Sequence, residues 1–346
     1  MSTTKVAING FGRIGRTFFR MAVDHPDIEV FAINDLGDIE NLAYLLRYDT
    51  VYGQSGLEVS TEPDALVVNG ARIAFSQIKD PKTLPWQSLG VDIVLEATGV
   101  FTSYATAKAH LEAGAKRVVI SAPVKDDPTA AAVDGATVLM GVNEDELKTC
   151  TITSNASCTT NASSPLVSIL KAGVGIEKAL LNTVHAYTAT QSIVDGPAKD
   201  LRKGRAAAQN IIPTSTGAAV ATTKVHTELT DKFDGIAMRV PVPVGSIVDI
   251  TFVASRETSV AEVNQLLKDA AESKAWNKLF AVTDEPIVSS DIIGARFAAI
   301  ADLSFTRVVG GNLVKVLAWY DNETSYTHTL LEHTAAVARF LGRKDT

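Results

Sequence analysis

Hydrophobic residues in the first half of the chain occur in short runs that alternate with stretches of helical character. The runs are KVAING (5–10), EVFAIND (29–35), VDIVLEATG (91–99), RVVISAP (117–123) and TVLMG (137–141). Helical periodicity lies between them, from Arg16 to about Val23 and over 102–115. This alternation is typical of βαβ units, in which helices join parallel strands. We therefore expect a parallel sheet flanked by helices.

The pattern changes after about residue 157. Longer strands are predicted at 180–187, 235–242, 246–255 and 313–321, with long loops and one clear helix over 259–273 between them. Strands of this kind favour a mixed or antiparallel sheet. Apolar residues at helical spacing between Thr327 and Phe340 predict an amphipathic helix that packs back on a sheet. We expect an α/β protein of two domains, 1–157 and 158–321, with a C-terminal helix (322–346) packing on the first domain.

Composition narrows the function classes. Of 346 residues, 46% are hydrophobic and 21% are charged, which is usual for a globular protein. No uncharged apolar segment of about 20 residues is present, so we expect neither export nor a membrane span. The net charge of −7 argues against nucleic acid as the main partner. The two cysteines, Cys150 and Cys158, form no disulfide framework and no zinc motif, which predicts a cytoplasmic protein with no metal site.

A glycine-rich stretch after the first predicted strand indicates a dinucleotide site. GFGRIG has glycines at Gly10, Gly12 and Gly15, directly before a predicted helix. This spacing permits a tight turn and a close approach of the backbone to a pyrophosphate at the helix N-terminus. Asp35 ends the next predicted strand, where a carboxylate binds the ribose hydroxyls and repels a 2′-phosphate. We expect a Rossmann domain that binds NAD in preference to NADP.

Cys158 is the candidate nucleophile. It lies in SNASCTTNAS, in the first turn of a predicted helix that ends near Gly173, with Ser157 as the N-cap. The positive end of a helix stabilises a thiolate, so we expect the pKa of Cys158 to fall to between about 3.5 and 7.5. The alternative is a buried, inert cysteine. His185, toward the end of a predicted strand in TVHAYTATQ, is a candidate acid/base partner, although a lone histidine is more often structural.

Positive charge is concentrated in LRKGR (201–205) and at Arg239. Arginine binds carboxylates and phosphates through two parallel hydrogen bonds, so an anionic ligand is expected here. The alternative for LRKGR is a solvated surface run.

Several motifs together resemble one family. SNASCTTN, HAYTATQ, DGPAKDLRKGRAAAQNIIPTSTGAA, MRVPVP and WYDNE, with INGFGRIGR and NDL, occur in the same order as in phosphorylating glyceraldehyde-3-phosphate dehydrogenases and span Asn9 to Glu323. The resemblance implies NAD-dependent oxidation of D-glyceraldehyde 3-phosphate, with inorganic phosphate, to 1,3-bisphosphoglycerate in glycolysis or gluconeogenesis. Cys158 would carry the thiohemiacetal and the thioester, and His185 would be its acid/base partner.

The resemblance also implies further site residues. Cofactor contacts are expected from Asn9, Arg13, Ile14, Ser121 and Asn322, in addition to Gly10, Gly12 and Asp35. Substrate-phosphate contacts are expected from Thr188 and Arg239, and contacts to the attacking phosphate from Ser157, Thr159, Arg205, Thr216 and Gly217. A homotetramer is implied, with the loop around 188–213 near an interface.

Two alternatives remain at this point. Erythrose-4-phosphate dehydrogenase shares the fold and the cysteine, and a non-catalytic NAD-binding protein can use the same scaffold. The chain also departs from the family's common pattern at Ala162, where a second cysteine is usual, and at Thr324 and Ser325, where an aromatic residue and glycine are usual. The segment 124–143 is a few residues longer than in most members.

Overall fold

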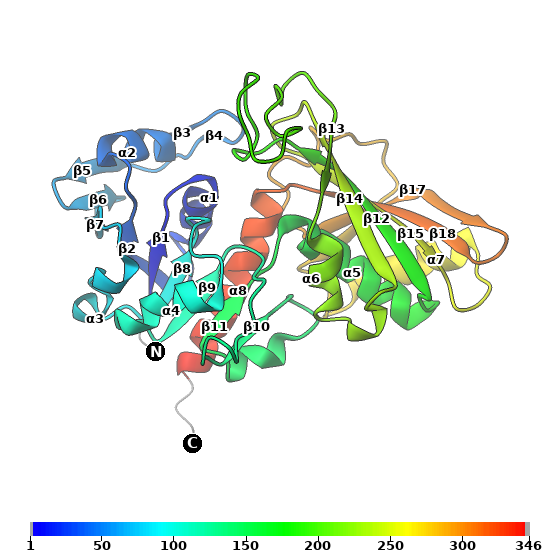
Figure 1. Cartoon of the computed structure of the whole chain (residues 1–346), viewed down its shortest axis with the longest axis horizontal. Coiled ribbons are helices and arrows are strands. Elements are labelled where there is room, and N and C mark those ends of the chain that lie inside the picture. Colours follow the sequence, from blue (N-terminus) through cyan, green and yellow to red (C-terminus); the bar gives the residue numbers. More distant parts are fainter. Residues whose placement is uncertain (1–2, 343–346) are drawn as a thin grey trace. The chain divides into compact units, whose positions relative to one another are not determined.

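The structure is a computed structural model that describes residues 3–342, and its helices and strands are drawn in Figure 1. The chain divides into two compact units. The first comprises the residues up to Val138, Asn143–Ala156 and the residues from Thr327 onward, and the second comprises Leu139–Val142 and Ser157–Tyr326. In the described part of the chain, no helix is both long and apolar enough to cross a membrane.

The first unit contains a sheet with helices between its strands. Its elements, with 3₁₀ helices written η, are β1 (Thr4–Asn9), α1 (Arg13–Ala22), β2 (Ile28–Asn34), α2 (Ile39–Arg47), β3 (Tyr48–Asp49), β4 (Gly53–Gln54), β5 (Val59–Glu62), β6 (Ala65–Val68), β7 (Ala71–Ser76), η1 (Pro81–Thr83), α3 (Trp86–Leu89), β8 (Ile93–Glu96), α4 (Tyr104–Glu112), β9 (Arg117–Ile120), β10 (Gly135–Thr137), η2 (Glu144–Lys148) and β11 (Ile152–Ser154). The strand order is β10-β11-β9-β8-β1-β2-β7-β6-β5. Strands from β10 to β7 pair in parallel, which requires crossovers such as α1 and α4. The last three strands form an antiparallel meander.

The second unit contains a mixed sheet. Its elements are α5 (Cys158–Gly173), β12 (Lys178–Ala186), β13 (Ile212–Ser215), α6 (Ala218–Thr223), η3 (Thr227–Leu229), β14 (Phe233–Val240), β15 (Ser246–Val253), α7 (Val260–Glu272), β16 (Phe280–Thr283), β17 (Ala299–Val309) and β18 (Leu313–Tyr320). The strand order is β13-β14-β12-β15-β18-β17-β16. The pairs β12–β14 and β16–β17 are parallel and the remaining pairs are antiparallel, as the sequence pattern predicts.

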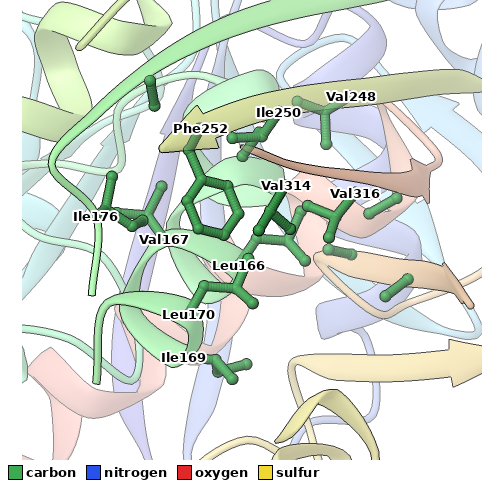
Figure 2. Packing of buried hydrophobic residues seen from close by; sticks show 14 of the residues in the cluster. Leu166, Val167, Ile169, Leu170, Ile176, Val248, Ile250, Phe252, Val314 and Val316 are labelled. Atoms are coloured by element: carbon green, nitrogen blue, oxygen red, sulfur yellow. The ribbon is translucent and has the colours of Figure 1, made fainter. Parts of the chain in front are cut away.

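One face of the mixed sheet packs on helices α5 and α7. Alternate residues of β15 and β18 point into this core, and Figure 2 shows Phe252 pointing from its strand toward the helix that carries Leu166 and Leu170. Strand side chains alternate between faces, so the opposite face presents the other set. Leu180 and Ile236 on that face are 66% and 50% exposed. The helices therefore bury only one side of this sheet.

The glycine-rich stretch forms a tight turn between β1 and α1. Gly10 has a φ of +97°, and a Cβ on it would lie 2.6 Å from the backbone nitrogen of Thr98. A Cβ on Gly15 would lie 2.1 Å from the carbonyl oxygen of Gly10. Around Gly12 no atom lies within 4 Å of such a Cβ. Glycine is therefore required at two of these positions for packing, while the third faces open space.

Helix α8 (Thr324–Gly342) begins in the second unit and continues into the first. It begins where Asp321 Oδ1 accepts hydrogen bonds from the backbone nitrogens of Glu323 (2.9 Å) and Thr324 (2.8 Å). Farther along, His333 Nε2 lies 2.7 Å from the Thr153 hydroxyl of β11. The sequence-based helix over 322–346 thus starts two residues later here, and its residues 343–346 lie outside the described ones.

The structure also differs from the sequence prediction elsewhere, and three of the differences have a clear cause. The strand expected over 137–141 is instead β10, because the chain turns at Leu139 and Gly141, with a φ of +80° at Gly141, and passes into the second unit. The strands β5 to β7 and β11 were not predicted, since the first three are short and partly exposed and the last has three residues. Strand β17 was missed because polar residues interrupt its alternation.

Gly15→Ala tests the packing of the glycine-rich turn. The added methyl group overlaps the carbonyl oxygen of Gly10, so the first unit should lose about 1–3 kcal/mol of stability. Gly12→Ala is the matched control, and it should cost about 1 kcal/mol or less, the penalty for alanine at an N-cap. Urea denaturation, with hydrogen exchange of β1 and α1 peptides, measures both. Equal losses in the two variants would contradict the steric argument.

Candidate active site

Cys158 is the first residue of helix α5, and Ser157 is the N-cap, whose hydroxyl accepts a hydrogen bond from the Thr160 backbone nitrogen (3.1 Å). The preceding residue, Ala156, has a φ of +55°. A left-handed backbone costs a non-glycine residue roughly 1–2 kcal/mol, so the turn into the helix is strained. Cys158 is half-buried, and its Sγ lies 3.3 Å from His185 Nε2.

His185 lies on β12, and the parallel register places it opposite Arg239 of β14. Its Nδ1 lies 2.6 Å from the Ala186 carbonyl oxygen and 2.6 Å from Arg239 Nη1, and the same guanidinium nitrogen lies 3.0 Å from the Ala186 oxygen. Burial, reinforced by the Arg239 charge, lowers the pKa of His185 to about 3. The imidazole is therefore neutral at pH 7.

The pKa of Cys158 moves opposite to the sequence-based expectation. Burial raises the pKa of the thiol, while the Arg239 charge and hydrogen bonds from Thr159 act to lower it. The expectation of a pKa between about 3.5 and 7.5 is wrong for this structure, because desolvation outweighs the favourable placement at the helix N-terminus. Cys158 and His185 thus face each other as a thiol and a neutral imidazole.

Tyr320, at the end of β18, supports this pair and was missed by the sequence reasoning. Its hydroxyl lies 2.9 Å from the Thr159 hydroxyl and 2.8 Å from that of Thr183, and its ring meets the His185 ring edge-on, with centroids 5.9 Å apart. The only signal in the sequence is its place in the WYD segment at a strand end. The hydroxyl of Thr159, expected to bind the attacking phosphate, is therefore buried against Tyr320.

The other residues expected to bind phosphate are partly engaged elsewhere. Arg205 lies on an exposed loop with its Nε 2.8 Å from Asp195 Oδ2. The Thr188 hydroxyl lies 2.8 Å from that of Thr190, and the Thr216 hydroxyl accepts a hydrogen bond from the Ala218 nitrogen (3.2 Å). Gly217 is the exposed N-cap of α6. The structure brings together Cys158, His185 and Arg239. Arg205 is instead paired with Asp195.

Asn322 follows β18 and is buried. Its Oδ1 accepts hydrogen bonds from the Gly245 nitrogen and from the Ser246 hydroxyl, both at 3.1 Å. These bonds fix the orientation of the amide, because an amide oxygen accepts and its nitrogen donates. The Nδ2 group is thus held as a donor, which is the group that a carboxamide oxygen of a ligand requires.

The first unit contains a cavity of about 710 Å³ lined by Asn9, Gly10, Gly12 and Asp35, among others. The Asp35 carboxylate accepts hydrogen bonds from the Phe11 nitrogen (2.6 Å) and the Gly37 nitrogen (2.8 Å), which hold it at the cavity wall. Helix α1 begins beside the cavity, its N-cap is Gly12, which has no side chain, and its first turn has no acidic residue. The positive end of a helix favours an anion such as a pyrophosphate, so these residues fit a dinucleotide.

Among the expected cofactor residues of the first unit, three do not line this cavity: Arg13, Ile14 and Ser121. The guanidinium of Arg13 pairs with Asp49 and lies over the ring of Tyr52. Two wall residues that the sequence reasoning missed are Thr98 and Lys79. Thr98 could have been found from its position, because ligands bind at the carboxyl ends of parallel strands and β8 adjoins β1.

Comparisons with known proteins agree with both units. Residues 4–104 match the family model described as the NAD binding domain of glyceraldehyde 3-phosphate dehydrogenase, and residues 157–322 match the model of its C-terminal domain. The chain is 48% identical to glyceraldehyde-3-phosphate dehydrogenase of Geobacillus stearothermophilus, over 96% of this chain and 98% of the relative. It is 47% identical to the enzyme of the same name from Streptomyces coelicolor, over 98% of this chain and all of the relative.

The chain belongs to the glyceraldehyde-3-phosphate dehydrogenase family. The residues at which it departs from the common family pattern have structural roles here. Ala162 lies on α5 and is fully buried in the core of the second unit, where a small side chain fits. Thr324 donates its backbone N–H to Asp321 Oδ1, and the Ser325 hydroxyl donates to the Asp321 carbonyl oxygen (2.5 Å). These two residues therefore help to begin α8.

Arg239→Gln tests the electrostatics of this family's cysteine site. Loss of the positive charge raises the pKa of Cys158 further, so less thiolate is present near pH 7 and alkylation by iodoacetamide should be slower. Each unit of pKa change alters the thiolate fraction about tenfold. Burial, the larger cause, keeps His185 neutral in the variant.

The measurement is the pH profile of alkylation, with peptide mapping of the modified cysteine. Cys158 should react before Cys150, which is buried and also has a raised pKa. Arg202→Gln removes an exposed charge from the loop and serves as the matched control, with an unchanged profile. A profile that moves to lower pH in Arg239→Gln would contradict the argument.

Proposed function

We propose that the protein is an NAD-dependent, phosphorylating glyceraldehyde-3-phosphate dehydrogenase that oxidises D-glyceraldehyde 3-phosphate to 1,3-bisphosphoglycerate. The family membership supports this reaction, and the 3.3 Å contact between Cys158 Sγ and His185 Nε2 is the observation that carries the chemistry. A non-catalytic scaffold has no need for a half-buried thiol aligned with a buried imidazole. Erythrose-4-phosphate dehydrogenase is not favoured, because the relatives described above carry the triose name.

The first step is attack of Cys158 on the substrate aldehyde. His185 takes the thiol proton at Nε2, which requires that its other nitrogen, Nδ1, carries a hydrogen and donates it to the Ala186 oxygen. Arg239 can only donate, and its Nη1 lies at the same Nδ1, so it opposes this tautomer. A substrate phosphate that binds Arg239 relieves that opposition. Substrate binding and activation of the nucleophile are thus linked through one guanidinium.

The product of attack is a thiohemiacetal on Cys158. When bound, NAD would supply the hydride acceptor by which this adduct becomes a thioester. On the protein side, the Cys158 backbone N–H at the start of α5 and His185 stabilise the transient oxyanion. Asn322, whose amide is held by Gly245 and Ser246, would donate to the nicotinamide carboxamide. Asp35 would hold the ribose, and the Gly10 to Gly12 backbone would hold the pyrophosphate, since these residues line the cavity of the first unit.

Inorganic phosphate then attacks the thioester carbon, the bond from that carbon to Cys158 Sγ breaks, and 1,3-bisphosphoglycerate is released while the sulfur takes up a proton to restore the thiol. Ser157, Thr216, Gly217 and Arg205 are the proposed contacts, with Thr159 contributing through its backbone. Arg205 is bound to Asp195 in an ion pair in which both side chains are about 60% exposed. Exposed pairs of this kind contribute roughly 0–1 kcal/mol, so a phosphate exchanges with Asp195 at little cost.

We propose a homotetramer. A closed tetramer with twofold axes needs at least two different self-complementary surfaces on each chain. The second unit offers two candidates. The outer face of its sheet presents Leu180, Ile236 and Leu313, and the loop between β12 and β13 presents Leu201 and Ile211, which are 85% and 71% exposed. Exposed apolar groups gathered in this way mark protein contacts.

The protein is proposed to act in glycolysis or gluconeogenesis in the cytoplasm, where its two free cysteines remain reduced. The first unit is the proposed cofactor domain and the second the catalytic domain.

Stopped-flow measurement of NADH tests the phosphorylating reaction. Without phosphate, glyceraldehyde 3-phosphate should give a burst of about one NADH per Cys158 and then little turnover, because the thioester waits for its acceptor. Phosphate or arsenate should restore steady turnover. His185→Asn should slow the burst on the order of 100- to 10,000-fold. Full steady turnover in phosphate-free buffer would identify water as the acceptor and exclude the phosphorylating reaction.

Ile236→Asp tests the assembly. A carboxylate on the outer sheet face must be desolvated in an interface, so the variant should dissociate to dimers or monomers. Val260→Asp is the matched control: Val260 is exposed in the first turn of α7, which packs on the opposite face of the sheet. Sedimentation equilibrium measures both masses. A tetramer that persists in Ile236→Asp would remove the outer face from the interface.

A further inference from the structure

Glu96, the last residue of β8, is a fully buried carboxylate that the reaction described above does not use. Its Oε2 accepts hydrogen bonds from Asn9 Nδ2 (2.6 Å) and lies 3.0 Å from His110 Nε2. Its Oε1 accepts from the Thr98 backbone nitrogen (2.8 Å) and from the Thr98 hydroxyl. A carboxylate only accepts, so it can satisfy all four of these donors at once.

The histidine in this cluster has a defined tautomer. Trp86 Nε1 lies 3.1 Å from His110 Nδ1, and an indole N–H can only donate. His110 Nδ1 therefore accepts, and the proton of the neutral ring lies on Nε2, from which it is donated to Glu96. The side chains of Trp86 and His110 are fully buried. The series of hydrogen bonds from Trp86 through His110 to Glu96 thus orients the carboxylate, and solvent does not take part in it.

The groups that Glu96 holds belong to the cofactor cavity. Asn9 and Thr98 line that cavity, whereas Glu96 lies behind them. The glycine-rich turn rests on the same segment, because a Cβ on Gly10 would lie 2.6 Å from the Thr98 nitrogen. One carboxylate therefore ties the end of β1 to the turn after β8, and both contribute backbone or side-chain atoms to the wall.

We propose that Glu96 is a positioning residue for NAD: its carboxylate, oriented by His110, holds Asn9 and Thr98, and through them the turn at Gly10, in the geometry that binds the dinucleotide. A buried carboxylate is costly unless every partner is in place, and an apolar side chain would fill the same space at lower cost. Donors from two segments of the cavity wall, at Asn9 and Thr98, meet at the Glu96 carboxylate. This arrangement gives the buried carboxylate a function in shaping the site.

Glu96→Gln is the primary test. The amide keeps the shape but turns one acceptor into a donor, which then faces a donor of Asn9, His110 or Thr98. The Kd for NAD, titrated without substrate, and the KM for NAD should rise about tenfold or more, with a smaller change in kcat at saturating NAD. Alkylation of Cys158 by iodoacetamide, which reports on the second unit, should be unchanged. These readouts do not depend on which aldehyde the enzyme uses.

Thr153→Val is the matched control. It removes another buried hydrogen bond of the first unit, between Thr153 and His333, away from the cavity. It should lower the melting temperature while leaving the Kd for NAD unchanged. If Glu96→Gln lowers the melting temperature in the same way and binds NAD normally, the role of Glu96 is only structural and the proposal is wrong.

Trp86→Phe provides a second variant in case Glu96→Gln fails to fold. It keeps an aromatic ring in the core, although a smaller one, and removes the N–H that sets the His110 tautomer. The Kd for NAD should rise several-fold, because no N–H then fixes His110 Nε2 as the donor to Glu96. A folded Trp86→Phe protein with the parental Kd would overturn the proposal.

Discussion

The parallel register of β12 and β14 places His185 beside Arg239, and the chemistry of the second unit depends on this one pairing. The pairing places the positive charge of Arg239 against the imidazole of His185, which burial already keeps neutral. The same charge favours ionisation of the Cys158 thiol, which burial opposes. The protein avoids the cost of a buried thiolate–imidazolium pair, which desolvation would impose. In the reaction proposed above, an anion that binds the guanidinium would free His185 Nδ1 to donate to the Ala186 oxygen, so substrate binding and activation of the thiol would be coupled.

Local patterns in the sequence predicted those features that depend on local physics. The GFGRIG spacing predicted the turn before α1, and Ser157 predicted the N-cap of α5 because a capping hydroxyl needs only its own neighbours. The pKa of Cys158 was predicted with the wrong sign, since burial depends on residues far along the chain. Tyr320 and Glu96 were missed for the same reason: the partners of Tyr320 lie 137 and 161 positions away, and Asn9 lies 87 positions from Glu96.

Two of the places where the chain departs from ordinary folding rules lie close to its proposed binding and reacting groups. Ala156 adopts a left-handed backbone immediately before Ser157 and Cys158, and Glu96 is a buried charge behind the cofactor cavity. Neither is expected in a chain selected for stability alone, and each is held by surrounding contacts. By contrast, the unusual Thr324 and Ser325 bond to Asp321 and follow the usual rules for beginning a helix.

The position of helix α8 in the first unit affects how the protein can fold during synthesis. Its His333 bonds to Thr153, and its Thr329 hydroxyl accepts from Asn155 Nδ2 (3.2 Å), so the first unit contains residues from both ends of the chain. A ribosome makes the strands of that unit before the helix, with Ser157–Tyr326 of the second unit synthesised in between. Domains that are contiguous in sequence can finish folding during synthesis. The long contiguous part of the second unit can do so, whereas the Thr153 hydroxyl of β11 must wait for His333 until α8 has left the exit tunnel.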